Sequence, residues 1–221
     1  MSKILLLIVI VAMGVFLYWR HQRDYNKTKH DRAHLFDDCM SLLKNSSLSQ
    51  QGLGFPRLKG QYNGFEVAIV LQADTLSMRK IPALWLMLTV IGKTPTQGSL
   101  DMIVRPQNTE FYSPSWDWDG TLTSPPDWPQ HAFIKYKHSV ASIAVLNNFV
   151  PNLFGNEKIK ELLVMPALLG ITYLLRQAER GEYLLMRNAK FDGTLINSME
   201  VKRILESAIE IRTGLERVVA S

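Results

Sequence analysis

The amino-terminal end of the chain carries a long hydrophobic run. Ile4–Trp19 contains sixteen residues and no charged side chain, and a helix of that length spans about 24 Å at roughly 1.5 Å per residue. A bilayer's hydrocarbon core is about 30 Å thick, so flanking residues must complete the span. Tyr18 and Trp19 suit the headgroup level, and Arg20 can extend toward it. The pattern predicts one membrane-spanning helix over residues 4–19.

A cleaved signal peptide is the alternative interpretation of this run. Signal peptides end in small residues at their cleavage site. Here the run ends in FLYWRHQR, which places bulky and charged side chains where small ones are needed. The sequence therefore favours a retained anchor, with residues 1–30 as anchor and basic neck and residues 31–221 as a single domain.

The first part of that domain reads as a helix followed by a sheet. Apolar residues recur at helical spacing from Asp31 to Lys44, and a polar, glycine-containing linker follows. Asn63 and Gly64 then suit a type I′ turn between two alternating segments. Residues 57–105 are predicted to form an antiparallel meander of about four strands. The almost wholly apolar segment around Trp85 is expected at the centre of the sheet.

The second part is predicted to contain a long loop, a second hairpin and a terminal helix. Residues 106–130 are rich in Pro and Trp, as in a surface loop. Residues 139–150 suggest a short helix, residues 161–175 a strand, turn and strand, and residues 171–191 a hairpin with its turn at 178–181. Residues 198–219 form an amphipathic stripe with Asn197 and Glu200 at capping-box spacing.

These elements predict an α+β fold: an amino-terminal transmembrane helix, then one domain whose mainly antiparallel sheet is packed by the long carboxy-terminal helix. The helical stripe has too few heptads for a coiled coil, so we expect it on the sheet. It consists of the apolar residues Val201, Ile204, Leu205, Ala208, Ile211, Leu215 and Val218.

The net charge of +5 gathers partly beside the hydrophobic run. The membrane-proximal basic residues are Arg20, Arg23, Lys27, Lys29 and Arg32. By the positive-inside rule they place the bulk domain in the cytoplasm, where they would face anionic lipid. A short amino terminus favours the opposite, periplasmic placement, so that side stays open. Without interleaved aromatic residues or a recognition helix, the charges do not indicate nucleic-acid binding.

Cys39 is the single cysteine, which excludes an intramolecular disulfide and a thiolate metal cluster. It lies in an apolar helical stripe and is predicted to fill the core, with palmitoylation as the alternative. His30 and His34 are four residues apart but lack a third ligand, so no metal site is predicted. The sequence contains no glycine-rich phosphate loop and indicates no cofactor.

One string resembles a catalytic motif. DWDGT, at 117–121, matches the D-x-D-G-T motif of haloacid-dehalogenase-type phosphatases, in which Asp117 and Asp119 would be nucleophile and acid/base. In that family a buried parallel strand precedes the motif and further carboxylates hold magnesium. Here FYSPSW precedes it, no acidic pair follows Asp127, and tight hairpins join the neighbouring strands. The context disfavours a phosphatase.

Trp116, Trp118 and Trp128 give this loop two alternative interpretations. They could pin the loop to the sheet, or, with Asp117 and Asp119, form an interaction surface for a partner. We predict a single-pass membrane-anchored accessory, assembly or interaction subunit without catalytic activity, with a membrane-protein partner. The alternative is an enzyme or lipid-binding module at the membrane surface, with Asp117, Asp119, Asp127 and His131 lining a polar site.

Overall fold

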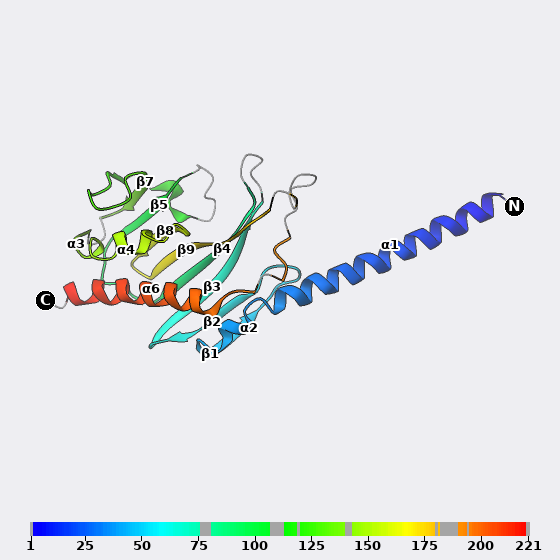
Figure 1. Cartoon of the computed structure of the whole chain (residues 1–221), viewed down its shortest axis with the longest axis horizontal. Coiled ribbons are helices and arrows are strands. Elements are labelled where there is room, and N and C mark those ends of the chain that lie inside the picture. The colour runs from blue at the N-terminus through cyan, green and yellow to red at the C-terminus, as the bar shows by residue number, and fades with distance from the viewer. Residues whose placement is uncertain are drawn as a thin grey trace.

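The computed structural model describes residues 2–75, 81–106, 113–118, 120–139, 143–179, 181, 190–193 and 195–219. It is an α+β fold in which helices accompany one large antiparallel sheet (Figure 1). The helices are α1 (Ser2–Ala33), α2 (Asp37–Met40), η1 (Pro114–Asp117, a 3-10 turn), α3 (Ile143–Leu146), α4 (Val150–Phe154) and α6 (Ser198–Val219). The strands are β1 (Lys44–Ser49), β2 (Arg57–Tyr62), β3 (Phe65–Asp74), β4 (Ala83–Ile91), β5 (Ser99–Val104), β6 (Gly120–Leu122), β7 (Ala132–Lys137), β8 (Ile159–Met165) and β9 (Leu168–Gln177).

The described strands form a nine-stranded sheet in the order β1-β2-β3-β4-β9-β8-β5-β7-β6. The Asn63–Gly64 turn is as predicted: both residues have positive φ, at 49° and 86°, and Tyr62 pairs with Phe65. β4 is central, between β3 and β9. The antiparallel meander expected over residues 57–105 is continuous only from β2 to β4, because the β8–β9 hairpin separates β4 from β5.

That hairpin turns at Pro166 and Ala167, within the strand, turn and strand expected from the sequence. β9 continues to Gln177, and the partner strand expected for it over the rest of residues 171–191 lies mostly outside the described residues. β9 instead pairs with β4 and β8 on its two sides. The strand therefore lies in the interior of the sheet.

The carboxy-terminal helix α6 covers one face of the sheet, as predicted (Figure 1). Six of the seven predicted stripe residues are buried, from Val201 to Leu215; the side chain of Val218 is outside the description. Asn197 caps the helix, since its Oδ1 accepts a hydrogen bond from the backbone N–H of Met199 at 2.8 Å. The stripe joins one core cluster with the alternate residues of the central strands.

The segment after α1 differs from its prediction. The helix expected over 31–44 is divided: α1 ends at Ala33, α2 covers only Asp37–Met40, and β1 begins at Lys44. The apolar stripe nevertheless enters the core, where Leu35, Phe36 and Cys39 are buried. The polar linker expected after residue 44 is partly an edge strand, since KNSSLS pairs along β2 through its backbone. Backbone pairing at an edge does not require alternating apolar residues.

Cys39 fills the core, as predicted. Its side chain is fully buried, and its Sγ lies 3.7 Å from the carbonyl oxygen of Ile196 at the start of the α6 region. Burial, with a smaller contribution from the charge of Asp38, raises the pKa of the thiol to about 11. The thiol is therefore protonated and shielded in the folded chain, which leaves palmitoylation without an accessible nucleophile.

Candidate functional site

Helix α1 projects away from the domain and exposes its apolar residues (Figure 1). Its 32 residues give a length of about 48 Å. Within the described part of the chain it is the one helix long and apolar enough to cross a membrane, and none of its most apolar window is buried. Side chains such as Leu5 and Phe16 are exposed by 66% and 56%. An apolar surface of this kind marks a site of contact with membrane or protein.

The carboxy-terminal end of α1 is bound to the domain. Arg32 Nε donates to Asp192 Oδ1 at 2.5 Å, its guanidinium lies 4.3 Å from the centre of the Phe55 ring, and it donates to the carbonyl of Leu53. The Gln50 side chain also donates to the carbonyl of Lys29 at 3.3 Å. These contacts hold the helix against the β1–β2 connection. A membrane crossed by α1 would therefore lie at a set position relative to the sheet.

The five basic residues of the neck divide into two groups. Arg20, Arg23, Lys27 and Lys29 are exposed between the apolar part of α1 and the domain. They are free to face lipid headgroups. Arg32 is half-buried in its contacts with Asp192 and Phe55, so its role in this structure is to dock α1. The sequence pattern did not distinguish this arginine from the others.

The loop that contains the tryptophans lies against the domain. Trp118 and Trp128 are buried, with 5% and 2% of their surface exposed, so their rings are not available to a partner in this conformation. Trp128 belongs to the main core, and its Nε1 donates to Asn147 Oδ1 at 2.8 Å. The side chain of Trp116 and all of Asp119 lie outside the described residues. For these two rings, pinning the loop is the role that the contacts support.

The described carboxylates of this loop, Asp117 and Asp127, are exposed. The side chain of Asp117 is 74% exposed and lies 3.6 Å from the ammonium group of Lys137. Asp127 and His131 are also exposed. No hydrogen bond or ion pair is found among these three side chains in the described part of the loop. Of the predicted interaction residues whose side chains the structure describes, Asp117 is therefore the exposed one.

Two other carboxylates are buried together, and sequence reasoning missed them. Asp101 on β5 and Glu161 on β8 are exposed by only 1% and 3%. In the register of the two strands, Ile103 is opposite Glu161 and Asp101 is opposite Leu163, so the two acids lie diagonally on one face of the sheet. Leu100, Met102 and Leu162 alternate with them and enter the core that α6 covers. The acidic pair therefore faces the side of the sheet opposite α6.

Hydroxyl groups bind one oxygen of each acid. Ser113 Oγ donates to Asp101 Oδ2 at 2.5 Å, and Thr172 Oγ1 donates to Glu161 Oε2 at 2.5 Å. Lys135, which is opposite Asp101 on β7, contributes a nearby positive charge and donates to the carbonyl of Ser115 at 3.0 Å. The remaining oxygens, Asp101 Oδ1 and Glu161 Oε1, accept no hydrogen bond from the N–H and O–H groups described.

Burial changes the acidity of both groups. Burial, together with the smaller effect of the neighbouring charge of Asp101, raises the pKa of Glu161 to about 8. Burial also raises the pKa of Asp101, against the lowering effect of its hydrogen bonds to Ser113 and Ser115. At neutral pH the pair therefore holds a proton, and its titration belongs to both acids together.

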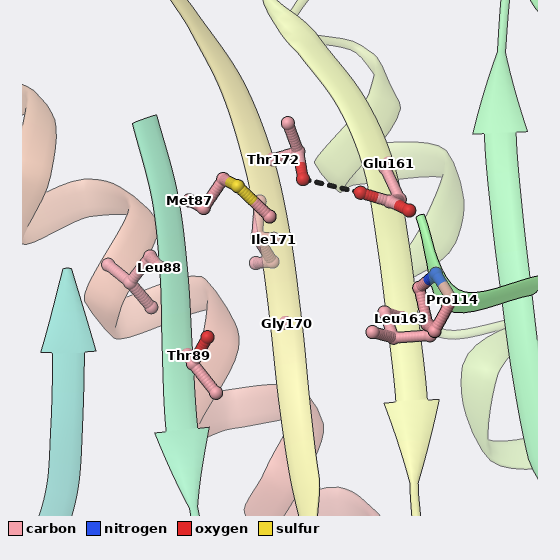
Figure 2. Close-up of a pocket in the computed structure, with 9 residues that line it drawn as sticks. All are labelled: Met87, Leu88, Thr89, Pro114, Glu161, Leu163, Gly170, Ile171 and Thr172. Atoms are coloured by element: carbon pink, nitrogen blue, oxygen red, sulfur yellow. Dashed lines mark hydrogen bonds between the residues drawn. The ribbon is translucent and has the colours of Figure 1, made fainter. Parts of the chain in front are cut away.

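A small pocket opens beside Glu161 on the same face. Figure 2 shows Glu161 and Thr172 hydrogen-bonded at one end, Met87 and Thr89 of β4 on one side, and Pro114 beside Leu163 on the other. Its volume of about 40 Å³ is enough for a few water molecules. Among the residues described, no cluster of three or more metal-ligating side chains occurs. Of the two acids, Glu161 lines the pocket, which therefore offers this acid a route to water.

The signal for this pair was present in the sequence. Asp101 in SLDMIV and Glu161 in IKELLVM are single acids within strongly apolar strand segments. An acid at such a position is either buried or at an edge. Only the insertion of β8 and β9 beside β5 brings the two together.

Replacing Glu161 with Gln is expected to change how stability depends on pH. The pKa of Glu161 is about 8 in the folded chain against an ordinary 4.5. Between these values the unfolded chain loses a proton that the folded chain keeps, so the free energy of unfolding falls as pH rises. The neutral Glu161→Gln variant lacks this loss. Its free energy of unfolding relative to that of wild type should therefore increase by a few kcal/mol between about pH 5 and about pH 8. Denaturant unfolding of both proteins at about pH 5 and about pH 8 measures the difference in free energy of unfolding. A free energy that changes with pH in the same way in both proteins would contradict the prediction.

Comparison with known proteins gives no functional assignment. Neither the family models nor the curated proteins match this chain. Among solved structures, the fold is similar to the crystal structure of the mycobacterial trehalose monomycolate transport factor A, TtfA. The match covers 80% of this chain and 76% of that chain, with 9% sequence identity and a TM-score of 0.46. At that level the similarity concerns the fold and carries no activity to this chain.

Proposed function

We propose that this chain is a single-pass membrane-anchored accessory or assembly subunit without catalytic activity of its own. The observation that carries the proposal is the exposed apolar part of α1 joined to a docked neck: Ile4–Trp19 is exposed along its length, whereas Arg32 ties the end of the helix to the domain. An anchor fixed to its domain presents that domain to the membrane in one orientation. Such an arrangement suits a subunit that must meet a membrane partner in a defined pose.

The charges of the neck support a cytoplasmic domain. Arg20, Arg23, Lys27 and Lys29 are exposed and directly follow the apolar segment. Positive residues beside a span favour the cytoplasmic side, where anionic lipids attract them by about 1 kcal/mol each. A reporter fused after Ser221 distinguishes the two sides, because an enzyme active only in the periplasm will be silent if the domain is cytoplasmic.

The surface proposed for the partner is centred on Asp117. Its carboxylate is exposed beside Lys137, and the neighbouring chain is held in place by buried Trp118. A rigidly supported surface loses little conformational entropy when a partner binds. Because the rings of Trp118 and Trp128 are buried, an exposed acid is a better probe of this surface than a buried tryptophan.

The test is capture of the full-length chain from its native membrane in mild detergent, followed by mass spectrometry. We expect a stoichiometric membrane protein to co-purify with wild type and to be lost, or reduced at least about tenfold, with Asp117→Lys, since like charges at an interface weaken association. Asp127→Lys is the matched control, because Asp127 is exposed in the same loop. Recovery of the chain alone, from cells that express it at its natural level, would argue against the subunit proposal.

A second candidate is a lipid-binding or enzymatic module at the membrane surface. The buried acids and their pocket favour it, since a strongly perturbed carboxyl group beside a pocket is a common feature of functional sites. The pocket's volume of about 40 Å³ admits only a small group. Lipid that co-purifies with wild type and is lost in Glu161→Gln would support this candidate over the first.

A further inference from the structure

Segment Ser113–Trp118 is held on the open face of the sheet by polar contacts that end at the buried acids. Ser113 donates to Asp101 and accepts from the backbone N–H of Ser115, while Lys135 donates to the carbonyl of Ser115. Pro114 lines the pocket beside Leu163 and Glu161 (Figure 2). Ser113, Ser115 and Trp118 are buried. The segment therefore rests on Asp101 through Ser113 and lies beside Glu161 through Pro114.

The placement of the acids favours a shared proton. Asp101 and Glu161 are buried and lie diagonally on neighbouring strands, and two carboxylates can only accept hydrogen bonds, so protonation of one of them supplies a donor and removes a buried charge. Asp101 Oδ1 and Glu161 Oε1 receive no other donor among the groups described and are the oxygens available to share the proton. Asp101 also accepts from Ser113 and lies near Lys135, which favours its charged form. Glu161 is therefore the acid that carries the proton.

We propose that Asp101 and Glu161 form a proton-operated latch that holds Ser113–Trp118 against the sheet when the pair carries its proton and releases it when the proton leaves. In the release step the O–H bond of the Glu161 carboxyl group breaks, its electron pair stays on the oxygen, and the proton passes through the pocket to water. Two buried carboxylates then face each other without a donor between them. Their repulsion and rehydration favour lifting the segment that covers them.

Among the residues that the structure describes, the groups around the pair do not compensate the second negative charge. From β7, Lys135 is the positive charge beside Asp101; from β9, Thr172 offers a neutral hydroxyl, as do Ser113 and Ser115 from the segment itself. β4 contributes the uncharged Met87 and Thr89 to the pocket. One cation near two carboxylates leaves an excess of negative charge in a buried site. The raised pKa of Glu161, about 8, is consistent with this arrangement and places release in mildly alkaline solution.

The test is hydrogen–deuterium exchange of the full-length chain in mild detergent from about pH 6 to about pH 10, with rates corrected for the intrinsic dependence of exchange on pH. Peptides covering Ser113–Trp118 are compared with peptides from β3 and β4. In wild type we expect the protection of Ser113–Trp118 to fall above about pH 8 by up to roughly tenfold per pH unit. The reason is that the equilibrium for opening of the segment depends on the ratio of ionised to protonated Glu161. The β3 and β4 peptides should not change.

Glu161→Gln separates the latch from a general effect of alkali. The amide of glutamine donates to Asp101 at every pH, so the segment should stay protected across the whole range. Asp117→Asn is the matched control, since it removes an exposed carboxylate of the same segment and should leave the wild-type transition in place. Constant protection in wild type, the same transition in Glu161→Gln, or a simultaneous loss in the β3 and β4 peptides would each overturn the latch.

Discussion

A chain that carries both Ile8→Arg and Val11→Arg is expected to leave the membrane fraction. Both positions lie in the middle of the apolar segment, where they are exposed by 59% and 58%. An arginine at the centre of a span costs about 2.5–3.5 kcal/mol, so the two together cost about 5–7 kcal/mol. At about 1.4 kcal/mol per factor of ten, the inserted fraction should fall more than a thousandfold. Sedimentation of membranes after an alkaline carbonate wash measures the loss.

The control for this prediction preserves hydrophobicity. A chain with Ile8→Leu and Val11→Leu should remain in the carbonate-resistant pellet, and its intact mass should show that residues 1–30 are retained. Carbonate-resistant membrane binding by the double arginine variant would show that another part of the chain holds it there. A wild-type mass lacking these residues would favour a cleaved signal peptide and remove the anchor from the proposal.

Trp128→Ala is expected to destabilise the domain by about 3–5 kcal/mol, the range observed when a buried tryptophan is truncated. Trp128 is 2% exposed and belongs to the main core, and its side chain donates a hydrogen bond to Asn147, the residue that follows α3. The substitution leaves a cavity and removes the hydrogen bond to Asn147, whose exposed side chain can bind water instead. Denaturant unfolding of the full-length chain in mild detergent, followed by circular dichroism, gives the change in free energy.

Two comparisons make the result interpretable. Trp128→Phe keeps most of the apolar ring and loses the hydrogen bond to the exposed Asn147, so it should cost about 0.5–1.5 kcal/mol, the net contribution of one hydrogen bond. Asp127→Ala, at the exposed neighbouring position, should stay within about 0.5 kcal/mol of wild type. A Trp128→Ala chain as stable as wild type would mean that the loop does not rest on this ring. If the prediction holds, a variant with alanine at Trp116, Trp118 and Trp128 would have a disrupted domain. Loss of partner binding in that variant could then not be assigned to the loop surface.

The buried and the exposed acids of this chain differ in how strongly their charge affects stability. Asp117 and Asp119 attracted attention because they belong to a recognisable string, yet Asp117 is exposed in a loop and its ion pair with Lys137 is solvated. Such a pair contributes little to stability. Asp101 and Glu161 belong to no motif, but burial gives their protonation state a large effect on free energy. The environment of a carboxyl group, rather than its local sequence, decides whether it can act as a switch.

The sequence by itself determined the elements whose signals are local and strong. The apolar run of α1, the Asn63–Gly64 turn and the stripe of α6 each depend on residues a few positions apart, and each element is present where it was expected. They were sufficient for the α+β fold with an antiparallel sheet and a covering helix. The burial of Cys39 also followed from its place in an apolar stripe.

Only the tertiary structure decided which strands are neighbours and which polar groups are buried. The local sequence pattern does not predict that the β8–β9 hairpin enters between β4 and β5. This strand pairing joins residues about sixty positions apart, such as Asp101 and Leu163. That insertion brings Glu161 beside Asp101, and the docking of α1 likewise brings Arg32 to Asp192. Local propensity carries no information about such distant contacts. They arise because the whole sheet buries the most apolar surface in this one order of strands.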